Sequence, residues 1–166
     1  MTAPDMIMYE EEYQRIKLII AKLRTDSNAK LVFLVDKNGQ QIAAQGELEN
    51  FDATSLASLT AGNVAATDGL AKLIGEREFS ILFHEGERDN IHISIVAQRV
   101  ILVVIFDSRS SLGLVRLRVK KSSAELTDVF EKIVRKITSE KELGSPEMES
   151  PFSEITDEDI DSLFSE

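Results

Sequence analysis

Apolar residues recur with two different periods along the chain, and the changes of period divide it into eight elements. Spacings of three and four residues predict helices at Glu10–Arg24, at Thr54–Glu76 and from Ser110 or Ser111 to Ile137. Apolar and alternating runs bounded by turn residues predict strands at Leu31–Val35, Gln40–Gln45, Glu78–Glu85, Ile91–Ala97 and Val100–Phe106. The predicted order is α-β-β-α-β-β-β-α, followed by a tail.

Turn residues and alternation define the strands more sharply than their composition does. Asn38-Gly39 lies between the first two strands, and Asn-Gly is the strongest short hairpin signal because both residues tolerate positive φ. Ile91–Ala97 alternates apolar with polar residues, which predicts a half-buried strand, whereas the unbroken Val100–Phe106 predicts a central one. The segment LGLVRLRVKK, at the start of the last helix, also alternates enough to fit a strand.

The helix predicted at Thr54–Glu76 has two apolar faces instead of one. The stripe of large residues that we expect to face the core comprises Leu56, Leu59, Ala66, Leu70, Leu73 and Ile74. The opposite side carries a row of small residues at intervals of four, namely Ala57, Ala61, Ala65 and Gly69. Gly62 and Gly69 each cost about 1 kcal/mol against Ala in a helix, so we expect close approach of another backbone to offset them. Either the small row is a docking face for a second chain, or the helix is buried on both sides within its own domain.

Composition favours one domain with a good core, since 166 residues hardly suffice for two. No apolar run reaches the 18 or so residues of a membrane span, and the N-terminus lacks the basic-then-apolar order of a signal peptide. The chain has no cysteine, which excludes disulfides and thiolate metal sites. These features together predict a cytoplasmic protein.

The net charge of −10 belongs almost entirely to the C-terminal tail. Residues 139–166 contain ten acidic residues and one basic residue, Lys141, so the preceding 138 residues are nearly neutral. Nucleic acid is therefore not an expected partner, because phosphate binding requires a basic surface. A basic protein surface is the more natural target for such a tail.

The tail has two parts of different composition. Ser139–Pro151 is polar and interrupted by Gly and Pro, which predicts a disordered linker. In the last segment, Thr156 with Asp159 resembles a capping box. The apolar residues of this C-terminal motif are Phe152, Ile155, Ile160, Leu163 and Phe164. The motif either folds into a groove of a partner, docks on its own domain, or stays disordered.

A search for catalytic chemistry finds no site. The chain has neither a GxxxxGK[ST] phosphate loop nor a GxSxG elbow. His84 and His92 lie on predicted strands and are expected to be sheet residues, not metal ligands. The acidic run starting at Asp157 lacks the glycine and the terminal glutamate of an EF-hand loop. We therefore predict a binding module with no catalytic residue, metal or cofactor.

The order of elements and four long segments resemble the roadblock/LC7 family, and within it the bacterial members that partner a Ras-like GTPase. These segments are LVFLVDKNGQQIA, SLASLTAGNVAATDGLAKLIGE, VILVVIFDSRSSLGLVRLRVKK and the acidic C-terminal motif. The resemblance implies an α+β fold with a five-stranded antiparallel sheet between a long middle helix and the two terminal helices. It implies a domain at residues 6–137, a flexible linker at 138–151 and the C-terminal motif at 152–166.

The resemblance also implies a function. Such proteins form homodimers by pairing edge strands and packing the middle helix beside its twin, and two copies bind one Ras-like small GTPase and accelerate GTP hydrolysis. The process implied is cell polarity and gliding motility, in the cytoplasm and enriched at a cell pole. The residues implied in GTPase binding are Ala61, Ala65, Asp68, Gly69 and Lys72. Those implied in the dimer interface are Ala57, Ser58, Ala61, Gly62, Phe79, Ile81 and Phe83.

Two mechanisms of GTPase activation are open to a protein without an active site of its own. One is an arginine finger in trans, for which Arg77, Arg88, Arg99 and Arg109 are undistinguished candidates. The other, which the resemblance favours, orders the switch regions so that the GTPase supplies every catalytic group. The C-terminal motif would then reach a second surface of the GTPase and modulate affinity or nucleotide exchange. The contrasting hypothesis is a non-catalytic scaffold that docks a GTPase or another complex; an enzyme with its own substrate is a poor third.

Overall fold

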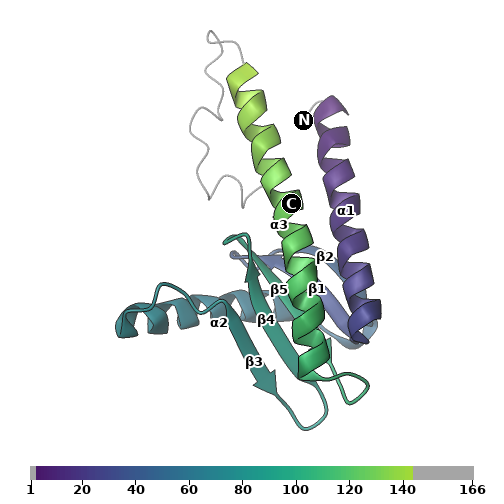
Figure 1. Ribbon diagram of the computed structural model, residues 1–166, viewed down its shortest axis with the longest axis vertical. Coiled ribbons are helices and arrows are strands. Elements are labelled where there is room, and N and C mark those ends of the chain that lie inside the picture. The colour runs from purple at the N-terminus through teal and green to yellow at the C-terminus, as the bar shows by residue number, and fades with distance from the viewer. Residues whose placement is uncertain (1–2, 144–166) are drawn as a thin grey trace.

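The computed structural model describes residues 3–143, with side chains described from residue 10 to residue 140 (Figure 1). Its helices are α1 (Ala3–Ser27), α2 (Ala53–Ile74) and α3 (Leu112–Leu143), with a short 3-10 turn, η1, at Leu48–Asn50. Its strands are β1 (Leu31–Asp36), β2 (Gln41–Gly46), β3 (Ile81–Glu85), β4 (Asn90–Val96) and β5 (Val100–Phe106). The predicted order of three helices and five strands is confirmed.

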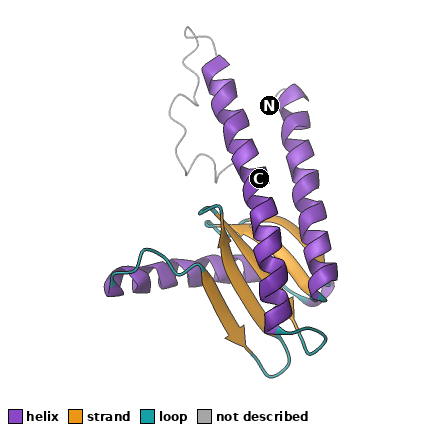
Figure 2. Cartoon of the chain, viewed as in Figure 1, coloured by secondary structure: helices purple, strands orange, loops and turns teal. Residues whose placement is uncertain are grey.

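The five strands form one antiparallel sheet in the order β2-β1-β5-β4-β3 (Figure 2). The central strand is β5, and all seven of its residues are buried, as its unbroken apolar sequence predicts. On one side it pairs with β1, for example at Val32 and Val104, and on the other with β4. The last three strands form a meander, which leaves β3 at one edge of the sheet and β2 at the other.

Helices cover both faces of the sheet. The two long helices α1 and α3 lie side by side on one face, where Ile20, Leu126 and Phe130 join a large apolar cluster. A smaller cluster lies on the other face, where α2 packs against β1 and its neighbours. In Figure 1, α1 and α3 extend well beyond the sheet, and α2 crosses the strands on the opposite side. The expected sheet between a middle helix and the terminal helices is therefore confirmed.

The sequence prediction for β4 is wrong in one respect, because this strand is buried on both faces. Ile93 faces α2, while His92 and Ser94 face the α1/α3 layer and are equally inaccessible. Polar residues in a strand predict an exposed face only when no second layer covers them. Burial lowers the pKa of His92, and the nearby charge of Arg116 lowers it further.

The β1–β2 turn and the β4–β5 turn have different chemistry. In the β1–β2 turn, the Asp36 carboxylate accepts hydrogen bonds from the backbone of Asn38 and Gln40, at 2.9 Å each. Only Gly39 takes a positive φ there, of 89°. In the β4–β5 turn, Ala97 and Gln98 both take positive φ, which is the geometry of a tight hairpin turn.

The ends of the helices differ from the sequence prediction. Helix α1 is longer than Glu10–Arg24, and LGLVRLRVKK is helical from Leu112 onward, not a strand. Apolar residues such as Val115 and Val119 pack on the sheet at helical spacing, which explains the partial alternation. Helix α3 continues to Leu143, beyond the expected domain end at residue 137. The remainder of the proposed linker, and the C-terminal motif at 152–166, lie outside the described residues.

No helix in the described part of the chain is both long and apolar enough to cross a membrane.

Candidate partner-binding face

Helix α2 begins and ends with well-formed caps, so its orientation on the sheet is fixed at both ends. The Asp52 carboxylate accepts a hydrogen bond from the backbone N–H of Ser55, at 3.1 Å, and one from its hydroxyl. These hydrogen bonds lower the pKa of Asp52. Gly75 ends the helix in the left-handed conformation, with φ of 81°.

The assignment of the two faces of α2 made from the sequence is wrong. The small residues Ala57 and Ala61 are only 1% and 7% exposed and belong to the cluster on the sheet. Of the large residues predicted to face the core, Leu56 is half-buried and packs against this cluster, whereas the others are exposed, to 73% at Leu59, 59% at Leu70, 84% at Leu73 and 68% at Ile74. The inner face of α2 is therefore small, and the outer face is large and apolar.

Close packing on its own hairpin explains why the inner face of α2 is small. A Cβ atom on Gly39, in the β1–β2 turn, would lie 3.2 Å from the Cα of Ser58 and 3.7 Å from the Cβ of Ala61. The backbone of the turn thus approaches the backbone of the helix, which only small side chains allow. Close approach of another backbone was expected at Gly62 and Gly69, but within the described chain it occurs at Ser58 and Ala61, and a Cβ atom on either glycine would meet nothing within 4 Å.

The outer face of α2 combines large side chains at its borders with small residues between them. Ala65, Ala66 and Gly69 are exposed, and a Cβ atom added to Gly62 or Gly69 would meet nothing within 4 Å. This outer face, defined by Leu59, Gly62, Ala66, Gly69, Leu70 and Leu73, has no covering element among the described residues. Contiguous exposed apolar surface of this kind marks an interaction site more often than a free surface.

The length of α2 is a signal that sequence reasoning could have used. A helix of 22 residues is about 33 Å long, whereas five strands at about 4.8 Å spacing make a sheet about 20 Å wide. A helix that crosses such a sheet must project beyond it, and in Figure 1 the C-terminal end of α2 extends past β3. Leu73 and Ile74 lie at this end, so their exposure follows from the geometry.

Strand β3, next to this projecting end, is an open sheet edge. Among the described strands it pairs with β4 alone, and Ile81 is 49% exposed. Asn63 of α2 lies 2.9 Å from the ring of His84, which ties the helix to this edge. An unpaired edge beside an apolar face offers both backbone hydrogen bonds and apolar contacts to a second chain.

The residues predicted to bind partners divide into two groups. The exposed ones that lie together on α2 are Ser58, Gly62, Ala65, Gly69 and Lys72, and Ile81 is exposed on the edge strand β3, where it pairs with Ser94. Asp68 and Phe79 are half-buried, and Ala57 and Ala61 face their own sheet. Phe83 is half-buried on the opposite face of the sheet, where its ring stacks on Phe106 with centroids 6.2 Å apart.

The arginines considered as fingers are spread over different parts of the surface. Arg109 is held by Asp107, at 3.0 Å, and lies 3.8 Å from Glu47. The hydrogen bond to Asp107 raises the pKa of Arg109 and lowers that of Asp107. Arg77 and Arg88 are exposed in turns, and Arg99 follows the β4–β5 turn. Within residues 10–140, no group of three or more His, Asp and Glu side chains could hold a metal ion, and His84 and His92 are sheet residues as predicted.

A five-stranded antiparallel sheet with α1 and α3 on one face and an outward-facing apolar α2 on the other defines a roadblock-type interaction domain. The chain belongs to the roadblock/LC7 family, whose domain matches residues 15–106. A comparison with curated protein sequences found no match.

Three solved structures are similar to this chain over most of their own length. MglB of Myxococcus xanthus is 62% identical, with a TM-score of 0.72, over 74% of this chain and 92% of that one. The gliding protein MglB of Thermus thermophilus is 32% identical, with a TM-score of 0.69, over 73% and 92%. An MglB with a tetrameric arrangement is 31% identical, with a TM-score of 0.68, over 73% and 91%. The chain is therefore an MglB-like member of the family.

Proposed function

We propose that this protein is a GTPase-activating protein for a Ras-like small GTPase of the MglA type. It acts as a homodimer whose two copies together bind one GTPase. The apolar outer face of α2 carries this proposal, because leucines exposed to this extent on a helix require cover by another molecule. Similarity to MglB structures supports the choice of partner.

The proposed contacts fall into two sets, one with the second copy of this chain and one with the GTPase. Ile81 on β3, with Ser58 and Gly62 on α2, meets the second copy, so that two β3 edges pair and two α2 helices lie side by side. Ala65, Asp68, Gly69 and Lys72 then lie along the two-helix surface that receives the GTPase. Ala57, Ala61 and Phe83 leave the proposed contact set, because their side chains pack within their own domain.

The proposed mechanism is positional and uses no catalytic residue of this chain. Phosphoryl transfer to water needs mainly orientation of the attacking water and stabilisation of charge on the transferred group. A flat surface of small residues can hold a switch loop of the GTPase in one conformation without obstructing it. Arg109 is already engaged by Asp107, which argues against its use as a finger in trans.

The C-terminal motif is assigned a second role in this proposal. Tethered to α3, it contacts another surface of the same GTPase and modulates affinity or nucleotide exchange. The process served is bacterial cell polarity and gliding motility, in the cytoplasm and with enrichment at a pole.

The test is GTP turnover by the MglA-type GTPase from the same genome, with and without this protein, alongside Ala65→Arg/Gly69→Arg. A Cβ atom at Gly69 would meet nothing within 4 Å and Ala65 is exposed, so the variant should fold while its outer face is blocked. We expect strong acceleration by the native protein and loss of at least about tenfold of it in the variant, since a misplacement of about 1 Å in the reacting groups can cost about 10²-fold in rate.

Helix α3 offers a matched control for this variant. Gly113 and Ala124 are exposed on α3, and a Cβ atom on Gly113 meets nothing within 4 Å, so Gly113→Arg/Ala124→Arg makes the same changes elsewhere. This control should retain full acceleration. GTPase binding without acceleration by the native protein would identify a roadblock scaffold instead, and absence of binding would refute the proposal.

A further inference from the structure

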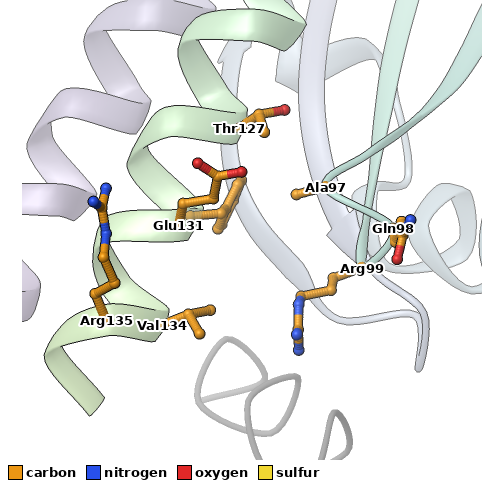
Figure 3. Close-up of a pocket in the computed structure, with 8 residues that line it drawn as sticks. Ala97, Gln98, Arg99, Thr127, Glu131, Val134 and Arg135 are labelled. Carbon is orange, nitrogen blue, oxygen red and sulfur yellow. The ribbon is translucent and has the colours of Figure 1, made fainter. Parts of the chain in front are cut away.

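A groove separates α3 from the β4–β5 turn, on the side of the molecule away from the outer face of α2 (Figure 3). Its volume is about 610 Å³. Val134 of α3 and Ala97 of the turn supply its accessible apolar surface, over the almost completely buried Phe130, and Arg99, Glu131 and Arg135 supply its charges. Figure 3 shows Arg99 extending from the turn and Arg135 on α3, with its guanidinium group on the side of the helix away from Arg99.

The chemistry of this groove suits a ligand that is both apolar and acidic. Phe130 and Val134 also pack on the α1/α3 cluster, so this part of the groove is built on rigid structure. Two arginines and one glutamate are among the residues that line the groove, and guanidinium groups bind carboxylates through paired, directional hydrogen bonds. An apolar residue flanked by acidic residues would satisfy both kinds of surface at once.

The chain carries such a segment a few residues after α3 in the sequence. Residues 144–166 contain eight acidic residues and no basic residue. The apolar residues of the C-terminal motif, Phe152, Ile155, Ile160, Leu163 and Phe164, are interleaved with these acids.

The connection to α3 is long enough for the motif to return along the helix. Arg135 lies eight residues before Leu143, which is about 12 Å along a helix. The eight residues 144–151 can extend over about 26–29 Å. The motif can therefore begin beside the last turns of α3 and run back toward the β4–β5 turn without distortion of the domain.

We propose that the groove between α3 and the β4–β5 turn is the docking site of the chain's own acidic motif, residues 152–166. The apolar side of the motif packs on Val134 and Ala97, and its carboxylates meet Arg99 and Arg135. A tether of eight residues gives an effective concentration on the order of millimolar, so a weak contact suffices for substantial occupancy. Docking on this site withdraws the motif from any other partner.

The absence of cysteine makes the test direct, because two introduced cysteines carry the only spin labels. Asp128→Cys lies on the exposed surface of α3 beside the groove without lining it, and Ser162→Cys lies within the motif. The distance distribution between the two labels is measured by pulsed electron spin resonance on the full-length protein, diluted with an excess of unlabelled chains. This experiment needs no GTPase, so its result is independent of the proposed function.

We expect a narrow short-distance component that survives dilution. Arg99→Glu/Arg135→Glu should lower the ratio of docked to free motif about tenfold, which corresponds to about 1.4 kcal/mol. Lys121→Glu/Lys132→Glu makes the same change of charge on exposed positions of α3 outside the groove and should leave the ratio unchanged. Arg135→Glu alone, at an exposed position, provides a milder variant if the double reversal does not fold.

Three results would overturn the proposal. A broad distribution in the otherwise native chain would mean that the motif does not dock on its own domain. The narrow component could instead disappear when the labelled protein is diluted with unlabelled chains, and appear in a mixture of two chains that carry one label each. This result would mean that the motif docks on a second copy. An equal loss in the groove variant and in the lysine variant would mean that net charge, not this groove, holds the motif.

Discussion

The two faces of the sheet are covered by helices of opposite design. On one face, α1 and α3 point large side chains such as Leu126 and Phe130 inward, and these are almost completely buried. On the other face, α2 points alanines inward and leucines such as Leu73 outward. The first arrangement completes the core of the domain. The second brings a backbone close to the sheet and leaves apolar surface for another molecule.

Polar groups sharpen the contrast between the faces. The α1/α3 layer buries the Glu12 carboxylate, which is paired with Lys136 at 2.6 Å, and it covers His92 and Ser94 on β4. On the α2 side, Thr60 is the buried polar side chain of the helix. Buried polar groups cost free energy unless they are paired, so they define the docking of α1 against α3 more tightly than apolar packing alone.

The largest effect is expected from truncating equivalent leucines on the two sides. Leu126→Ala, at a fully buried position of α3, should lower the free energy of unfolding by about 2–5 kcal/mol, through lost contacts and a cavity. Leu73→Ala, at an exposed position of α2, should change it by no more than about 0.5 kcal/mol in the monomer. Urea unfolding at several protein concentrations measures both.

The concentration dependence separates core from interface. Loss of stability in Leu126→Ala should be the same at every concentration, whereas Leu73→Ala should become destabilising only where the native chain is dimeric. If Leu73→Ala were as destabilising as Leu126→Ala in dilute solution, the outer face of α2 would be part of the core and the comparison would fail.

A smaller effect is expected at the ion pair between α1 and α3. Lys136→Met should leave the buried Glu12 carboxylate without its partner and lower the free energy of unfolding by about 2–3 kcal/mol. Glu12→Leu/Lys136→Met should recover most of this loss, because an apolar pair of similar volume needs no desolvation of charge. A double-mutant cycle measures the coupling. Equal instability of the double variant would show that shape, not charge pairing, is decisive there.

Much of the fold follows from the pattern of the sequence. The unbroken Val100–Phe106 identified the central strand, because only a strand buried on both faces is apolar throughout, and Asn38-Gly39 identified the first hairpin through the backbone preference of Gly39 for positive φ. The boundary at Leu112 was less certain, since LGLVRLRVKK fits two periods at once.

The sequence alone was enough to locate the candidate site on α2, but it did not show which face of the helix points away from the sheet. Periodicity shows that a face is buried, not which molecule buries it, so the row of Leu59, Leu70 and Leu73 looked like a core stripe. The decisive contact is between Gly39 and the backbone near Ser58, which are 19 positions apart. A long-range approach of this kind leaves no periodic trace in the sequence.

Replacement of glycines by alanine should change the free energy of unfolding by about 1 kcal/mol, with opposite signs at the two sides of α2. Gly62→Ala and Gly69→Ala, on the outer face of α2, should each raise the free energy of unfolding of the monomer by up to about 1 kcal/mol, because a Cβ there meets nothing and Ala favours helix. Gly39→Ala should do the reverse, since its φ of 89° disfavours Ala and its Cβ would crowd Ser58. Thermal and urea unfolding measure the sign of the change in the free energy of unfolding for each variant. Destabilisation at Gly62 or Gly69 in the monomer would mean that this face is already covered within one chain.

The smallest effect concerns pH and the two histidines on either face of the sheet. His92 is 1% exposed beneath α3, and burial, with the charge of Arg116, lowers its pKa below the usual 6.5. Protonation therefore favours the unfolded chain, so the stability associated with neutral His92 is complete above about pH 6.5 and declines as the pH falls below it. Urea midpoints at about pH 7.5 and about pH 5.5 should differ more for the native protein than for His92→Leu. His84→Leu, at an exposed position on β3, is the matched control and should keep the native difference. If His92→Leu also kept the native difference between the two pH values, the acid sensitivity would arise elsewhere in the protein. The two faces of the sheet would then not differ in the pH dependence of stability that they confer.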